Sequence, residues 1–120
     1  MKAVLVAAIA CACQSHGGGS DDELAQAKAT TQTFFDALDK ADCATLGSLV
    51  PAAEGSAACA KFVHEWHEEL ALRLVEIADV RRDGRDKHAI IVNATVMRRG
   101  NKETLLLRET HDAGVWRIVL

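Results

Sequence analysis

The clearest strand pattern of this chain lies in its last third, His88-Ala89-Ile90-Ile91-Val92-Asn93-Ala94-Thr95-Val96-Met97-Arg98. From Ile90 to Val96 an apolar side chain stands at every second position, which is typical of a β-strand with one buried face. Turn-forming residues flank the stretch, with Asp83-Gly84 before it and Gly100-Asn101 after it. Such short turns join antiparallel neighbours, so residues 88–98 are predicted to be the second strand of a meander.

Three more strands are predicted around it, at residues 72–80, 104–110 and 115–120. Asp112-Ala113-Gly114 is the turn between the last two strands. Trp116, Ile118 and Leu120 share one face of the final strand. We therefore expect that strand to pack inward along its whole length.

Helical patterns precede the strands. The first helix is expected to begin near Ser20, where Ser20-Asp21-Asp22-Glu23 has the form of a capping box. Asp42 is the expected cap of a short second helix from Cys43 to about Leu49, which Pro51 stops. Ser56 is the expected cap of a third helix. Two apolar stripes recur at helical spacing, namely Leu24, Ala27, Thr31, Phe34, Phe35 and Leu38, and Cys59, Phe62, Val63, Trp66 and Leu70. Helices followed by a meander predict an α+β fold in which the helices cover the apolar face of the sheet.

Composition limits the class of protein. The chain has 120 residues, the size of one domain, and only 4% of them are aromatic, with no tyrosine. Its 14 basic and 17 acidic residues give a formal charge of −3, which argues against nucleic acid as a partner.

The start of the chain is typical of an exported protein. Residues 1–10 combine a basic start with a short apolar run, as secretory signals do. Ala8-Ile9-Ala10-Cys11 resembles the lipobox of bacterial lipoproteins. This resemblance implies that Cys11, or Cys13 as second acceptor, carries a lipid that anchors the protein in the bacterial cell envelope, at the outer membrane or the periplasmic face. Residues 11–20 would be the anchor and a glycine-rich tether, and residues 21–120 the folded domain. Secretion after ordinary cleavage, and a cytosolic chain, remain alternatives.

The order of elements resembles the NTF2-like (cystatin-like) superfamily. The resemblance rests on Ala29–Asp42, where paired aromatics precede an acidic stop, and on the closing Val115-Trp116-Arg117-Ile118. It implies a curved four-stranded sheet that wraps around the first helix as a cone, with a pocket at its wide end. The exposed sheet edge would allow a homodimer, as in many members. The superfamily holds enzymes, binding modules and scaffolds, so the resemblance leaves function open.

Two cysteines, Cys43 and Cys59, remain in the predicted domain. An even pair in a chain with an export signal favours a disulfide. The alternative is two unrelated buried thiols, which pack as small apolar residues.

One cluster has the residue types of a metal site. His64, His67 and Glu68 stand at i, i+3 and i+4 of the third predicted helix and would share a face there. A solvated polar face opposite the apolar stripe explains the same residues, and we favour that interpretation.

An enzyme is the second class of function considered. Glu76 and Asn93 interrupt predicted strands and are the candidates for a pocket acid and its partner, as in an isomerase or dehydratase. The chain lacks the tyrosines that often polarise the substrate in enzymes of this superfamily, and no nucleophile–base pair is evident. The sequence therefore favours a non-enzymatic binding or structural module of the envelope, with no cofactor and with a protein or small molecule as ligand.

Overall fold

The computed structural model describes residues 19–120, which form three α-helices followed by a four-stranded antiparallel sheet. The helices are α2 (Gly19–Lys40), α3 (Cys43–Leu49) and α4 (Ser56–Val63), with a 3-10 turn η2 (Pro51–Ala53) and a π-helical segment η3 (His64–Glu69) on either side of α4. The strands are β1 (Arg73–Asp83), β2 (Asp86–Arg98), β3 (Asn101–Asp112) and β4 (Val115–Val119), paired in chain order. The predicted α+β class and antiparallel meander are confirmed.

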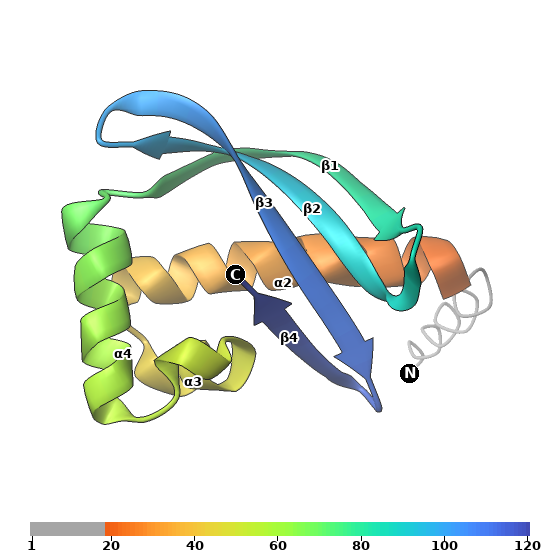
Figure 1. Cartoon of the computed structure of the whole chain (residues 1–120), viewed down its shortest axis with the longest axis horizontal. Helices are drawn as coiled ribbons and strands as arrows, with labels where there is room; N and C mark the ends of the chain where they lie inside the picture. The colour runs from red at the N-terminus through yellow and green to blue at the C-terminus, as the bar shows by residue number, and fades with distance from the viewer. Residues whose placement is uncertain (1–18) are drawn as a thin grey trace, which may run out of the picture.

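The sheet curls around α2 without closing. Figure 1 shows β2 and β3 crossing α2, with β1 above the helix and β4 below it, and with α3 and α4 beside the carboxyl half of that helix. Part of the curvature originates in β1, where the register with β2 shifts between Leu74 and Glu76 and again between Ile77 and Asp79. Each shift is a bulge that adds one residue and bends the strand. As a result Leu74, Ile77 and Val80 are half-buried at every third position, and β1 lacks the two-residue alternation of a regular strand.

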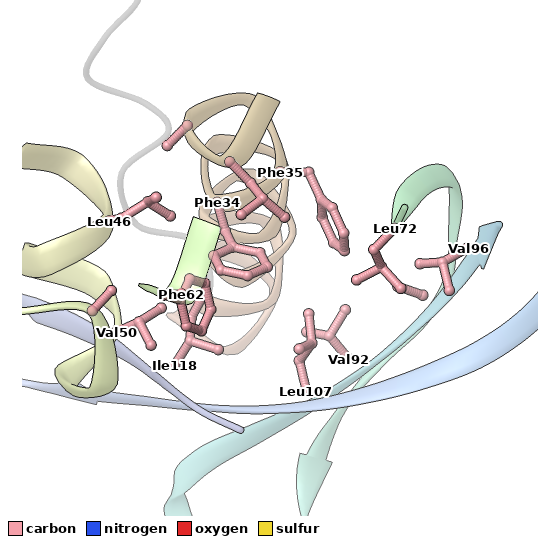
Figure 2. Packing of buried hydrophobic residues seen from close by; sticks show 14 of the residues in the cluster. Phe34, Phe35, Leu46, Val50, Phe62, Leu72, Val92, Val96, Leu107 and Ile118 are labelled. Atoms are coloured by element: carbon pink, nitrogen blue, oxygen red, sulfur yellow. The ribbon is translucent and has the colours of Figure 1, made fainter. Parts of the chain in front are cut away.

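The core lies between α2, the other helices and the concave face of the sheet. Phe34 is fully buried at its centre, and its ring makes edge contacts with Phe62 and Trp66. Figure 2 shows Phe34, Phe62 and Ile118 gathered on one side, and Val92 and Leu107 rising from the sheet. The sheet contributes these buried residues: Ala89, Ile90, Val92, Ala94, Val96, Leu107 and Ile118. The predicted inward face of β2 is therefore confirmed.

Two of the three predicted helix caps need correction, although the helices start where the sequence predicts. Ser20 already lies within α2 (Gly19–Lys40) and not before it. Gly55 precedes α4 and has a φ of 99°, a backbone conformation that favours glycine. Ser56 is the first residue of the helix, and no side chain of the described residues caps this helix start. Asp42 does cap α3, because its carboxylate accepts a hydrogen bond from the Thr45 amide at 3.2 Å.

The strand ends also differ from expectation. β3 already begins at Asn101, and the residues with positive φ in the preceding turn are Arg99 at 53° and Gly100 at 85°. At the end of the chain Ile118 is buried, whereas Leu120 is 47% exposed. The prediction that the last strand packs inward along its whole length is therefore wrong, because β4 ends at Val119 and Leu120 lies beyond the sheet.

The predicted signal of residues 1–10, Cys11, Cys13 and most of the predicted tether lie outside the residues that the structure describes. Among residues 19–120, no helix is both long and apolar enough to cross a membrane.

Candidate functional site

A cavity of about 210 Å³ lies between the end of η3 and the turn end of the β2–β3 hairpin. Its apolar wall is formed by Trp66, Leu70, Leu72, Val96 and Leu105, and its polar part by Arg98, Glu103 and Thr104. Arg98 and Glu103 are paired at 3.1 Å and are both about half exposed. The cavity therefore has an apolar interior and a charged, solvated rim.

The π-helical segment positions Trp66 beside this cavity. The Leu70 amide donates to the Glu65 carbonyl at 2.9 Å, five residues back, so this turn is wider than an α-helical one. The Leu72 amide then donates to the Trp66 carbonyl at 3.1 Å. On the opposite side, the Arg99 amide donates to the Leu70 carbonyl at 2.9 Å and fastens the hairpin to the helix end. Both walls of the cavity are thus held by backbone hydrogen bonds.

A polar cluster joins the amino-terminal half of α2 to the sheet. The Glu23 carboxylate contacts Arg82 and lies 3.0 Å from His111 Nδ1. These contacts lower the pKa of Glu23, with the His111 hydrogen bond as the largest cause and the Arg82 hydrogen bond next. The His111 ring stacks on Trp116 at 4.4 Å, and the Trp116 indole donates to Gln26 at 3.3 Å. The cluster therefore connects α2 with β1, β3 and β4.

A second contact between α2 and β3 is fully buried. Glu109 on β3 is 0% exposed, and its Oε2 is hydrogen-bonded to the Thr31 hydroxyl on α2. Its Oε1 has no hydrogen-bond partner among the described residues. Burial raises the pKa of Glu109 to about 7, although the Thr31 hydrogen bond opposes this shift. Glu109 is not among the candidate residues predicted from the sequence. It follows Leu105 and Leu107 at a spacing of two, so the sequence does place an acid on the apolar face of β3, and this pattern could have identified it.

The three weak metal-ligand candidates His64, His67 and Glu68 do not form one ligand set, because the two histidines contact different acids. His64 Nε2 lies 3.3 Å from Glu69, whereas His67 Nε2 lies 3.4 Å from Asp39 on α2. His67 Nδ1 is 3.7 Å from Glu68. Within residues 19–120, no group of three or more His, Cys, Asp or Glu side chains is placed to hold a metal ion. The shared helix face assumed α-helical spacing, and this segment is π-helical.

Glu76 and Asn93 lie on the face of the sheet opposite the core. Glu76 is exposed and pairs in register with Thr95, while Asn93 lies between the inward-facing Val92 and Ala94. Asn93 Oδ1 is buried and has no hydrogen-bond partner among the described residues. The sheet therefore places neither candidate in the space between helices and sheet, and this placement gives no support to an enzyme that uses Glu76 as its base.

The disulfide expected from the sequence is present. Cys43, the first residue of α3, is bonded to Cys59 in α4, and their Cα atoms are 5.8 Å apart. The bond fastens these two helices to each other across η2.

The described domain is thus an α+β domain with one disulfide, an apolar cavity and a buried acid. Comparisons with models of protein families, with curated proteins and with solved structures found no match to this chain.

Proposed function

We propose that this protein is a lipid-anchored protein of the bacterial cell envelope whose NTF2-like domain binds a small apolar ligand and catalyses no reaction. The observation that carries the envelope location is the Cys43–Cys59 disulfide. Disulfides persist in oxidising compartments outside the cytosol, and this one occurs in a chain whose start resembles a lipoprotein signal. The succession of helices and a curled antiparallel sheet supports the NTF2-like assignment.

Acylation at Cys11 would explain how the domain is retained at the membrane. A single acyl chain binds membranes marginally, whereas a diacylated cysteine gives stable anchoring. Gly19 and Ser20, the end of the predicted tether, already belong to α2. Residues 11–18 would therefore tether the domain to the lipid surface. A substitution of Cys11 therefore tests both the lipid attachment and the retention of the protein in the cell envelope.

We expect a Cys11→Ala substitution to abolish incorporation of a fatty-acid analogue and to release the protein from the membrane fraction. Metabolic labelling followed by fractionation of the cells measures both effects. Cys13→Ala is the matched control and should keep the label, because Cys13 is two residues further on and is the poorer lipobox match. Unchanged labelling of the Cys11→Ala variant would refute acylation at Cys11.

Ligand binding is proposed for the cavity beside Trp66. Its volume of about 210 Å³ is below the roughly 300–1,000 Å³ of sites for drug-sized ligands. It would therefore take a single ring, a small fused bicyclic such as indole, or a short alkyl chain. Trp66 and Leu105 supply apolar contact, and the Arg98–Glu103 pair at the rim offers a polar partner to one end of the ligand.

Filling this cavity should weaken binding of a small aromatic probe. We expect Leu105→Trp to reduce the affinity for indole about tenfold or more, which corresponds to about 1.4 kcal/mol or more. Isothermal titration calorimetry measures the affinity. Leu106→Trp is the control, because Leu106 is the next residue on β3 but is 60% exposed on the other face of the sheet. Equal affinity of both variants and the unmodified protein would place any indole site elsewhere.

A further inference from the structure

Glu109 is enclosed by α2 and three strands. In register it pairs with Ile90 on β2 and Ile118 on β4, and both of these side chains are fully buried or nearly so. Thr31, also 0% exposed, faces it from α2. A carboxyl group in such surroundings can keep a charge only if donors or a cation surround it.

The hydrogen bonds around Thr31 indicate which group supplies the proton. The Thr31 Oγ1 atom lies 3.1 Å from the carbonyl oxygen of Ala27 and also contacts Glu109 Oε2. A hydroxyl group has one proton to donate. When Thr31 donates that proton to Ala27, the contact with Oε2 is a hydrogen bond only if Glu109 is protonated and donates to Thr31. The unpartnered Oε1 favours the same state, because a buried carboxylate oxygen without a donor is costly.

No cation neutralises Glu109 in the described part of the chain. The other charged and titratable groups that join α2 to the sheet are Glu23 from α2, Arg82 from β1 and His111 from β3 itself. Arg82 and His111 both contact Glu23, and neither is paired with Glu109. β2 and β4 present isoleucines to Glu109. Glu23 is therefore paired with two side chains, whereas Glu109 lies among apolar side chains.

We propose that Glu109 is a proton-operated latch between α2 and the sheet, closed while the carboxyl group is protonated and donates to Thr31, and loosened when it loses that proton. Once ionised, Glu109 has Thr31 as its one available donor among the described residues, and the carboxylate gains stability by admitting water. The proposed loosening lies at the middle of α2, because Thr31 is the group that loses its hydrogen bond with the protonated acid. The domain would then be held more firmly in an acidic envelope than in a neutral one.

The direction of the pH effect follows from linkage. Burial raises the pKa of Glu109 from 4.5 to about 7, so the folded protein binds this proton more tightly than the unfolded chain does. Stability from Glu109 is therefore fully present below pH 4.5 and is lost as the pH rises toward 7. Glu23 acts in the opposite sense: its lowered pKa stabilises the folded protein above pH 4.5, and this contribution is lost on acidification.

The test compares the full chain with Glu109→Gln, which is a neutral isostere of the protonated acid. The unfolding equilibrium constant should increase from pH 5 to pH 8 in the unmodified protein. This increase should be larger than the increase in Glu109→Gln by a factor on the order of a hundred. Urea unfolding at each pH measures the equilibrium constant. Glu23→Gln is the control and should keep the full rise. An equal pH dependence in the unmodified protein and Glu109→Gln, or its loss in Glu23→Gln, would overturn the proposal.

Hydrogen exchange separates a local latch from a general loss of stability. After correction for intrinsic exchange rates, amides of α2 around Thr31 should open about tenfold more often at pH 8 than at pH 5, relative to amides of β2, and Glu109→Gln should remove this difference. Equal loss of protection in α2 and β2 would overturn a latch located at α2. If Glu109→Gln does not fold, carbon-13 titration of the Glu109 carboxyl group decides in the unmodified protein: a midpoint near 7 supports the latch, and a midpoint below 5 overturns it.

Discussion

Replacing Phe34 by alanine should lower the free energy of unfolding by about 3–5 kcal/mol, the cost typical of truncating a buried phenylalanine. Phe34 is 0% exposed and is among the largest fully buried side chains of the described domain. Its ring centroid lies 5.0 Å from that of Phe35 and 6.2 Å from that of Phe62. Truncation would therefore open a cavity where α2, α4 and the sheet meet, and Figure 2 shows the side chains that would line it.

Urea or thermal unfolding measures this effect. In a domain of this size the loss corresponds to a fall in midpoint temperature of about 15–30 °C. Gln32→Ala is the matched control, since Gln32 lies two residues earlier on the exposed face of α2 and should change stability by no more than about 0.5 kcal/mol. A loss below 1 kcal/mol for Phe34→Ala would contradict the central position of this ring.

Periodicity was sufficient to predict most of the fold. In β2 the alternation of apolar and polar residues identified the inward face, and every inward residue from Ile90 to Val96 is buried. In α2 the helical stripe that contains Phe34 and Leu38 is buried in the same way. These patterns succeed because burial against one neighbouring layer imposes the geometric period of the element directly on the sequence.

Periodicity failed where the backbone departs from ideal geometry. Two bulges in β1 change its period, and no local residue such as glycine marks them, because a bulge depends on the register with the neighbouring strand. The π-helical η3 likewise separates His64 from His67, which α-helical spacing would place on one face. Both features depend on tertiary contacts that a single segment does not contain.

The buried acid shows the same limit for the candidate site. The spacing from Leu107 to Glu109 places a carboxyl group on the apolar face of β3, and that can be read from the sequence. Its partner Thr31 is 78 positions earlier in the chain, and Thr31 already fits the helical stripe as a small side chain. Only the packing of α2 on β3 brings the two side chains together and explains why the acid is tolerated.

Loss of the Cys43–Cys59 disulfide is the second change expected to have a large effect. The bond joins residues 16 positions apart, and closing a loop of this length stabilises a protein by about 3 kcal/mol in the chain-entropy model. A domain of about 100 residues buries a limited core, so this is a large share of a total stability of about 5–15 kcal/mol. We therefore expect reduction alone to lower the free energy of unfolding by about 3 kcal/mol.

Reduction is the sharper test because it leaves the sequence unchanged. The unmodified protein should lose stability when dithiothreitol is added, whereas the double variant Cys43→Ala/Cys59→Ala should be equally unstable with and without it. The double variant also controls for reactions of Cys11 and Cys13, which it retains. Mass spectrometry under non-reducing conditions checks the starting state, and two free thiols at Cys43 and Cys59 in protein taken from the cell envelope would contradict the bond.

The position of the disulfide determines which part of the domain should respond first. Cys59 is fully buried in α4, three residues before Phe62, which packs against Phe34. Reduction should therefore increase hydrogen exchange in α3 and α4 before it does so in β2, whose amides are held in ladders with strands on both sides. Because α4 leads directly into η3 and Trp66, the same reduction should weaken indole binding. A reduced protein that binds indole with unchanged affinity would show that the cavity is held by the Leu70–Arg99 backbone contact without help from the disulfide.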